Sequence, residues 1–555
     1  MIQVTENNDA PCKDKTDALH RKIHQTMGKY FLFFLFVLQI HTIKGQNRNI
    51  SNGLIFDGEP FIVVNPSDPQ HLVVAWMGFV LQNRVMIKTR VSRDAGRTWS
   101  QAQTVQHIEA GYTSADPSLA FDNNGNVFLS YIDYDPYFTS GAVYLRKSAD
   151  GGLSWGNPVT VIDINADPGQ LPVDRPWISV DRSGGEYNGN IYITTVNATG
   201  AEGPAHHPYF IASSDNGNTF GPWRYADSTG WLAGSLVKKP MPAPVVTSNG
   251  TFHCIYPSFV TSQSLLPQFI LATSHNAGTT FTYGTVYSSG LAVAVADTSA
   301  KKGYLLKANP SNPGHLVFFN LSNENGDSDV FFRESLNAGL TWSEGIRIND
   351  DTVGNGRMQD LVWAGFDTDG DLAVTWRDRR NAADTGYIAS YEIYCTSRRN
   401  ESTVFSPNFR ISDTSIEFNE ILLGNGNDFM SVELTNDTLN AVWGDTRDGK
   451  LNIWFQRVTI DGTLVSVQQL THETLPDIRV FQTGPHTLEV IAERTKRICI
   501  FSSSGSLVLD SGAVQGSGTY ELNISGLTPG LYVINVETES GSMNFKSILH
   551  QHTVK

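Results

Sequence analysis

Short runs of alternating apolar and polar residues recur between Glu59 and Leu470, and Gly- and Asn-rich turns separate them. One stretch from Ser118 to Asp133 reads SLAFD, then the polar turn NNGN, then VFLSYID. Alternation with a period of two, bounded by turn residues, is typical of half-buried β-strands. Four such runs fill each repeating unit, and we count seven units. Six units plus one irregular unit remain an alternative, because the stretch from Tyr304 to Asn349 has a poor first strand.

A local motif, Ser-x-Asp/Asn-x-Gly-x-Thr/Ser-Trp/Phe, follows the third run of the units. Clear copies begin at Ser92, Ser148, Ser213, Ser274 and Ser335, so successive starts are 56, 65, 61 and 61 residues apart. The Asp or Asn can cap a tight turn, the Gly can adopt a positive φ, and the aromatic ring can pack beneath the turn. We therefore expect the motif to close a hairpin and to have a structural role, through Asp94, Trp99, Asp150, Trp155, Asp215, Phe220, Asn276, Phe281, Asn337 and Trp342.

Tandem units of four strands predict an all-β fold of the β-propeller type, with seven blades favoured and six as the alternative. The repeats end near residue 471, and from Pro476 short strands alternate with Gly/Ser turns. We assign 46–471 to the propeller and 472–555 to a small Ig-like β-sandwich.

The chain begins with a targeting pattern. An apolar run of 13 residues, Phe31 to Ile43, follows Lys29 and precedes the small residue Gly45. This run is too short to span a membrane, which takes about 20 residues, and it predicts a signal peptide over 27–45. Residues 1–26 lack targeting features and are interpreted as an over-long gene start. No second run has this character, so we expect no membrane span in the mature chain.

The composition narrows the functional classes. Forty Lys+Arg against 55 Asp+Glu give a net charge of −15, which argues against a nucleic-acid-binding protein. The four cysteines show no CxxC spacing, so we predict no metal or redox site for them. We expect no cofactor, and a structural calcium ion is left open.

Candidate chemistry lies opposite the repeated motif. In a propeller, the loops between second and third strands and the connections into first strands share one face, and polar residues gather in these segments. Paired carboxylates suit acid/base catalysis on a glycosidic bond, and arginine forks suit anionic groups. The catalytic candidates are Asp174, Asp360 and Asp378, and the substrate-binding candidates are Arg175, Arg357, Arg379, Arg447, His206 and His207.

Structural roles compete with these assignments. The pattern Trp-x-Asp-x-Arg occurs at Trp376 and again at Trp443, and repetition in equivalent loops favours ion pairs that bridge neighbouring blades. Glu59 and Asp116 each precede a proline, which favours turn capping. The adjacent His206 and His207 have no third ligand at metal spacing, so no metal site is predicted.

Two resemblances follow from these motifs. The repeated motif resembles the Asp-box, or BNR repeat, of sialidase-like propellers. The segments ICIFSSSGSLVL (Ile498–Leu509) and LNISGLTPGLYVINVET (Leu522–Thr538) resemble the type A sorting domain of the Bacteroidetes type IX secretion system. The second resemblance implies a protein that is secreted or attached to the cell surface, with the type IX machinery as a partner.

The sialidase resemblance does not extend to the reaction centre. Sialidases carry Phe/Tyr-Arg-Ile-Pro before the first blade, whereas this chain has Glu59-Pro60-Phe61-Ile62 without an arginine. The family's arginine triad, Tyr/Glu pair and acidic Asp find no counterparts. The leading hypothesis is a glycoside hydrolase acting on an acidic glycan. The alternatives are a non-catalytic glycan-binding or adhesion propeller and a lyase acting on a uronic-acid polymer, so the sequence leaves open whether the protein is an enzyme.

Overall fold

The computed structural model describes residues 47–549, apart from residues 54, 81–83, 202, 204, 235, 291–302, 420–426, 464–477, 504–505, 515 and 539–540. The predicted signal peptide (27–45) and the segment before it lie outside the described residues. The chain forms two compact units, Met1–Val465 and Ser466–Lys555, and each is treated by itself. Among the described residues, no helix has the length and apolar character needed to cross a membrane.

The described part of the first unit forms seven four-stranded antiparallel sheets. The first sheet contains β2 (Asp57–Asn65), β3 (Asp68–Val80), β4 (Arg84–Ser92) and β5 (Gln103–Thr104), and the second contains β6 (Thr113–Phe121), β7 (Val127–Tyr134), β8 (Gly141–Ser148) and β9 (Val159–Asp163). The third contains β10 (Asp174–Val180), β11 (Ile191–Val196), β12 (Tyr209–Ser213) and β13 (Arg224–Tyr225). The fourth contains β14 (Ala243–Val246), β15 (Phe252–Ser258), β16 (Gln268–Ser274) and β17 (Thr282–Ser288). The other three are β18 (Tyr304–Ala308), β19 (Leu316–Ser322), β20 (Asp329–Ser335) and β21 (Ile346–Arg347); β22 (Gln359–Phe366), β23 (Leu372–Asp378), β24 (Glu392–Arg398) and β25 (Phe409–Arg410); and β26 (Ser431–Thr435), β27 (Thr438–Asp445), β28 (Asn452–Thr459) and β1 (Arg48–Asn49).

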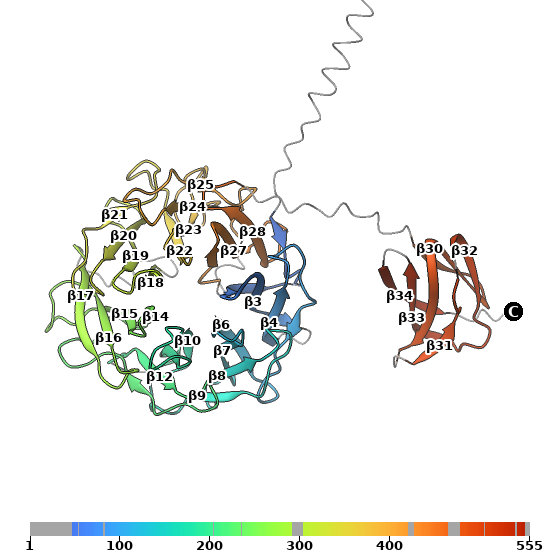
Figure 1. Cartoon of the computed structure of the whole chain (residues 1–555), viewed down its shortest axis with the longest axis horizontal. Helices are drawn as coiled ribbons and strands as arrows, with labels where there is room; N and C mark the ends of the chain where they lie inside the picture. Colours follow the sequence, from blue (N-terminus) through green and yellow to red (C-terminus); the bar gives the residue numbers. More distant parts are fainter. Residues whose placement is uncertain are drawn as a thin grey trace, which may run out of the picture. The chain divides into compact units, whose positions relative to one another are not determined.

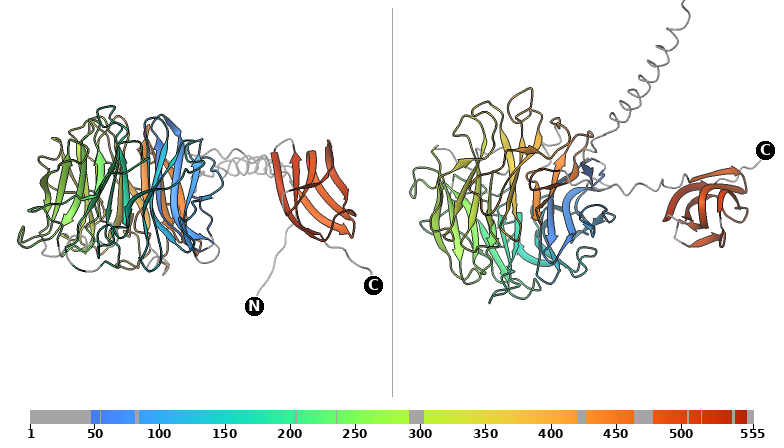
Figure 2. Two further views of the ribbon diagram at one scale, coloured as in Figure 1. Left: turned by 90° about the horizontal axis from the view of Figure 1, so that it is seen from below. Right: turned by 45° about the horizontal axis from the view of Figure 1, so that its top comes forward.

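These sheets stand as wedges around a central axis (Figures 1 and 2). The first strand of each sheet contacts the first strands of both neighbouring sheets, from β2 through β6, β10, β14, β18 and β22 to β26, and β26 returns to β2. The ring is therefore closed, and its first strands line the central channel. The prediction of an all-β fold of the propeller type is confirmed.

The N-terminal segment closes the ring by completing the last sheet. Strand β1 pairs antiparallel with β28, and the Ile50 amide donates to the Ile453 carbonyl oxygen at 2.8 Å. The Asn47 side chain donates to the Ile411 carbonyl oxygen at 3.0 Å, which ties the same segment to the neighbouring sheet. Residues far apart in the sequence thereby hold the ring together.

The repeated motif lies between the third and fourth strands of its sheet, as predicted. In the first copy, the Gly96 amide donates to Ser92 Oγ at 2.8 Å and the Thr98 amide donates to Asp94 Oδ1 at 2.8 Å. The same two bonds recur in the copies that begin at Ser148, Ser213, Ser274 and Ser335.

The aromatic residue of the motif packs against the preceding sheet. Trp99 meets Phe455 edge-on at 5.3 Å between ring centroids, and Phe281 meets Phe210 in the same way at 5.3 Å. The motif glycine also lies against the preceding sheet. A Cβ atom on Gly278, whose φ is +80°, would come within 2.1 Å of the Phe210 ring. The motif therefore closes a hairpin and fastens one sheet to the next.

The second unit contains β29 (Arg479–Gly484), β30 (Thr487–Ser502), β31 (Leu507–Asp510), β32 (Gly516–Asn523), β33 (Gly530–Thr538) and β34 (Gly541–Leu549). Strand β30 has 16 residues. Its first half pairs with β29 and β32, and its second half pairs with β31 and β33. All six strands thus belong to one hydrogen-bonded sheet around an apolar core that includes Ile498, Ile500 and Ile534. The Ig-like description stays a prediction.

Candidate functional site

A strained bulge recurs near the start of the first strands. The register shifts between Gly58 and Phe61 in β2, between Ala115 and Ser118 in β6, and between Asp174 and Trp177 in β10. The bulged residues Glu59, Asp116 and Arg175 have φ of 54°, 52° and 52°. A positive φ on a residue other than glycine costs of order 1–3 kcal/mol and often marks a functional site.

These bulges bring together side chains from several sheets, which we call the Arg175 cluster: Glu59, Asp116, Asp174, Arg175, Lys239 and Asp428. The Arg175 guanidinium donates to the Asp428 carboxylate and lies 3.7 Å from Asp174 Oδ1. The backbone amide of Arg175 donates to Asp116 Oδ2 at 3.2 Å. Lys239 Nζ donates to Asp174 Oδ2 at 2.6 Å.

The cluster lies on the face opposite the repeated motif, because it occupies the starts of first strands and the connections that lead into them. Glu59 is buried, and its Oε1 accepts the backbone amides of Asn427 and Asp428 at 3.3 and 3.4 Å. The side chains of Asp174, Asp428 and Arg175 are 14%, 18% and 21% exposed. A ligand can therefore reach these three groups.

The surroundings push the pKa values of the acids apart. Burial, followed by the charge of Asp116, holds the pKa of Glu59 well above its usual range, and the two carboxyl groups are within hydrogen-bonding reach of each other. Burial and the charge of Asp116 also raise the pKa of Asp174 to about 6, although Arg175 and Lys239 oppose that rise. Burial alone would lower the pKa of Arg175, but Asp428 and the other acids raise it, so its charge is retained.

Asp360 and Arg379 lie in a buried ion group and not in the Arg175 cluster. Arg377 Nε donates to Asp360 Oδ1 at 2.5 Å, and Arg379 Nη1 donates to the same oxygen at 3.3 Å. All three side chains are at most 1% exposed. Burial would raise the pKa of Asp360, but the two guanidinium groups lower it. Asp360 thus remains ionised and inaccessible.

Asp378 and Arg447 belong to the twice-repeated Trp-x-Asp-x-Arg pattern. Asp378 Oδ2 accepts from Trp376 Nε1 at 2.6 Å and from Arg380 Nε at 3.0 Å. The equivalent bonds to Asp445 come from Trp443 at 3.1 Å and Arg447 at 2.8 Å. The two arginines also reach carboxylates next to the preceding sheet, Asp350 and Asp413. The pattern therefore links adjacent sheets.

The other candidate residues lie elsewhere. Arg357 donates to the carbonyl oxygens of Ala383 and Asp384. His207 Nδ1 lies 2.9 Å from Asp227 Oδ1, and its ring stacks on Tyr225 at 4.0 Å. His206 is buried, and burial lowers its pKa. Within the described residues, none of these three side chains is hydrogen-bonded to or ion-paired with the Arg175 cluster.

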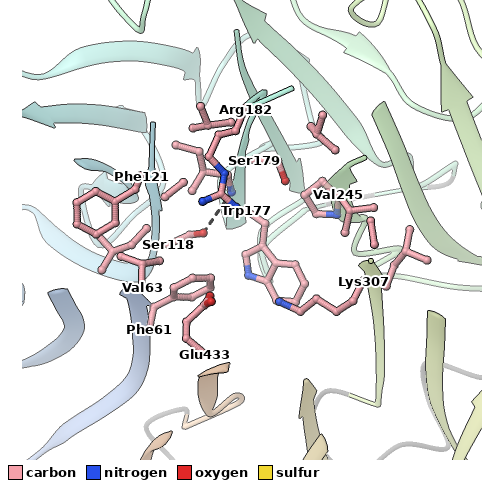
Figure 3. A pocket seen from close by; sticks show the side chains of 18 of the residues that line it. Phe61, Val63, Ser118, Phe121, Trp177, Ser179, Arg182, Val245, Lys307 and Glu433 are labelled. Atoms are coloured by element: carbon pink, nitrogen blue, oxygen red, sulfur yellow. Dashed lines mark hydrogen bonds between the residues drawn. The ribbon is translucent and has the colours of Figure 1, made fainter. Parts of the chain in front are cut away.

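A second feature of the channel is a cavity that opens on the face of the propeller where the repeated motif lies, which we call the motif face. Its inner part has a volume of about 210 Å³, and a wider mouth of about 450 Å³ continues from it. Phe61, Trp177 and Trp363 form the inner end, where Trp363 meets Trp177 at 5.4 Å and Phe61 at 5.5 Å between ring centroids. Figure 3 shows Phe61 and Trp177 beside charged side chains that reach into this space.

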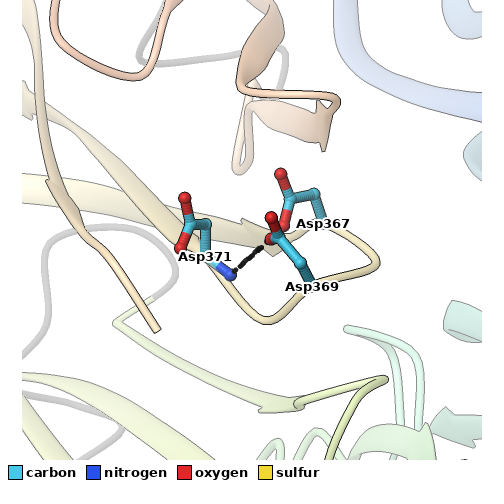
Figure 4. A group of neighbouring side chains, drawn as sticks. All are labelled: Asp367, Asp369 and Asp371. Atoms are coloured by element: carbon cyan, nitrogen blue, oxygen red, sulfur yellow. Dashed lines mark hydrogen bonds between the residues drawn. The ribbon is translucent and has the colours of Figure 1, made fainter. Parts of the chain in front are cut away.

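One turn offers several carboxylates to a cation. Oxygen atoms of Asp367, Asp369 and Asp371, between β22 and β23, lie within 4.8 Å of one another (Figure 4). Burial and a hydrogen bond that the Asp367 carboxyl donates to Asp369 raise the pKa of Asp367 to about 7. The Asp371 amide donates to Asp367 Oδ1 at 3.1 Å, and Asp371 also pairs with Arg399. These bonds account for the arrangement, so we assign no metal to it.

Asp174 and Arg175 were candidates from the sequence and the structure brings both into the Arg175 cluster, whereas the other members of the cluster were not among the candidates. Glu59 and Asp116 were interpreted as turn caps, and Lys239 and Asp428 were not included among the candidates. The available signal was the recurrence of an acid or arginine directly before proline at the start of consecutive units.

Comparison with known proteins identifies the C-terminal domain. Residues 483–550 match the family described as "Secretion system C-terminal sorting domain". This match confirms the predicted type IX sorting domain, and the protein is secreted or anchored on the cell surface. No curated protein matches the chain.

Several solved structures are similar to this chain. A Dyadobacter fermentans protein of unknown function has 15% identity and a TM-score of 0.39, covering 64% of this chain and 99% of its own. A Penicillium chrysogenum α-L-arabinanase has 12% identity and a TM-score of 0.43, with coverages of 76% and 99%. A PL25 ulvan lyase has 12% identity and a TM-score of 0.36, with coverages of 61% and 76%. At these scores, none of these likenesses assigns an activity to the chain.

Proposed function

We propose that the chain is an exported glycoside hydrolase, built on a seven-bladed Asp-box propeller, whose reaction takes place at the Arg175 cluster. The main support is that Asp174 and Asp428 both contact one guanidinium, and that burial with the charge of Asp116 raises the pKa of Asp174 to about 6. Cleavage of a glycosidic bond requires two carboxyl groups, one protonated and one ionised, and their surroundings set these different states.

The roles follow from protonation and access. Asp174 is protonated below about pH 6 and donates its proton to the glycosidic oxygen. Asp428, whose carboxylate contacts Arg175, acts as the second carboxylate, either as the base toward water or as the nucleophile. Lys239 orients Asp174, and burial with the charge of Asp116 keeps the pKa of Asp174 raised.

The charge balance favours a neutral glycan over the acidic one expected from the sequence. The cluster contains four acids against Arg175 and Lys239. Arg379 and Arg447, the other arginines expected to hold an anion, are each paired with carboxylates. The same pairing weakens the lyase alternative, which needs a free arginine for the uronate carboxylate.

The second candidate function is non-catalytic glycan binding at the cell surface. It is favoured by the ion pairs themselves: Asp174 contacts Lys239 and Arg175, and Asp428 contacts Arg175, so that the cluster is a stable rim.

The test is turnover. The full chain would be incubated with a panel of neutral and acidic polysaccharides, and the products separated by anion-exchange chromatography. We expect cleavage of a neutral glycan, with a loss of at least about 100-fold in Asp174→Asn and in Asp428→Asn. Asp150→Asn is the matched control, because two motif copies already carry Asn at that position. Binding without products would favour the adhesion alternative, and full activity in both cluster variants would refute the proposal.

A further inference from the structure

The channel cavity on the motif face is lined by aromatic and charged side chains that are suited to binding a ligand. The aromatic side chains of Phe61, Trp177 and Trp363 stand at its inner end, and no residue of the Arg175 cluster is among the described residues that line it. The cavity and the Arg175 cluster therefore have different lining residues.

Three charged side chains enter this cavity from different sheets: Arg182 from the turn after β10, Lys307 from β18 and Glu433 from β26 (Figure 3). Within the described residues, none of the three side chains makes a hydrogen bond or a close ion pair, and Lys307 Nζ only lies 5.5 Å from the centre of the Trp363 ring. Charged groups that leave water without a partner lose solvation energy.

Burial acts on two of these charges. It lowers the pKa of Lys307 and raises the pKa of Glu433, although each partly offsets the effect on the other. Lys307 and Glu433 both lack a hydrogen-bonded partner among the described residues and lie beside open space. This arrangement suits a ligand that forms hydrogen bonds with both side chains.

We propose that this cavity binds a small neutral saccharide of one or two sugar units. Arg182, Lys307 and Glu433 give the space charges of both signs, so an ion of either sign would meet a like charge and an uncharged ligand fits better. Sugar hydroxyl groups donate to the Glu433 carboxylate and accept from Lys307, and the apolar face of a sugar ring packs on the aromatic end. The mouth, with a volume of about 450 Å³, is in the range of small-molecule sites.

The residues around the mouth of the cavity also favour a neutral saccharide. Uncharged amides and hydroxyls surround it, including Asn123, Ser183, Thr368 and Asn436. Such groups bind hydroxyls without demanding a charge on the ligand. This inference does not depend on hydrolysis at the Arg175 cluster, because its residues and its mouth are different.

The experiment is saturation-transfer NMR on the full chain with D-glucose, D-galactose, D-mannose, D-xylose, cellobiose, maltose and lactose. We expect transfer to at least one sugar, weakened at least tenfold in Glu433→Gln and in Lys307→Met. Tryptophan fluorescence of the two variants verifies that they are folded.

Asp150→Asn is the matched control, because Asp150 lines neither the cavity nor the Arg175 cluster, and it retains saccharide binding whether or not the proposed hydrolysis occurs. The proposal is overturned if no sugar in the panel shows transfer, if both cavity variants bind like the wild type, or if glycine displaces the sugar, which would mark an amino-acid site.

Discussion

Replacing Asp174 with asparagine should change the stability of the propeller in a way that depends on pH. Its pKa is about 6 in the folded chain, against 3.8 for a free aspartate. The difference of about two units corresponds to about 3 kcal/mol, at about 1.4 kcal/mol per unit. Because the folded pKa is raised, this stability is present below the unfolded pKa and is lost as the pH rises through about 6. Asparagine does not ionise, and its side-chain oxygen can still accept from Lys239.

Urea unfolding followed by tryptophan fluorescence measures the effect. All 11 tryptophans lie between Trp76 and Trp454, so their emission reports only the first unit. We expect Asp174→Asn and wild type to unfold with similar free energies at pH 4. At pH 8 the variant should be more stable, by up to about 3 kcal/mol.

Asp360→Asn is a control with the opposite sign. Arg377 and Arg379 lower the pKa of Asp360 against the effect of burial. Its contribution is therefore present above the unfolded pKa and is lost as the pH falls through the folded value. Removing the carboxylate should cost about 3–5 kcal/mol at pH 7, since two buried cations lose their partner. A difference between Asp174→Asn and wild type that stays constant from pH 4 to pH 8 would refute the description of the cluster.

Three further predictions concern the frame that holds the site. Ser51→Ala should lower the free energy of unfolding by about 1–2 kcal/mol in urea titrations, because Ser51 Oγ accepts from the Ile453 amide and donates to Asn452 where the ring closes; an unchanged midpoint would contradict that role. Ser213→Ala should cost a similar amount by the same assay, because the buried Gly217 amide loses its acceptor, and Ser213→Thr should retain most of the stability. Cys254 and Cys395 are buried and burial raises the pKa of both thiols, so they should react with a thiol reagent at pH 8 only after unfolding, and rapid labelling of the native chain would show that they are accessible.

Features encoded by neighbouring residues could be predicted from the sequence. The hairpin motif contains its own capping group, glycine and aromatic residue within eight positions, so the third and fourth strands could be placed without tertiary information. The closure of the ring could not, because β1 is a two-residue strand whose partner, β28, lies about 400 residues later in the chain.

The site was only partly predictable for the same reason. Arg175 and Asp428 are 253 positions apart, and nothing in either local sequence indicates that they meet. Asp360 and Asp378 have the residue type and the rim position of catalytic acids, yet neighbouring arginines and Trp376 occupy their oxygens. Burial and partners decide which carboxylate can react, and both depend on packing between sheets.

The most direct test of the central claim is the pH dependence of kcat/KM for the polysaccharide that the panel identifies. If Asp174 is the proton donor, the rate should fall as the pH rises through about 6, because the acid is lost by ionisation. Asp174→Asn should lack activity at every pH, while Asp150→Asn should reproduce the wild-type profile. A rate that stays level from pH 5 to pH 8, or an active Asp174→Asn, would contradict the account.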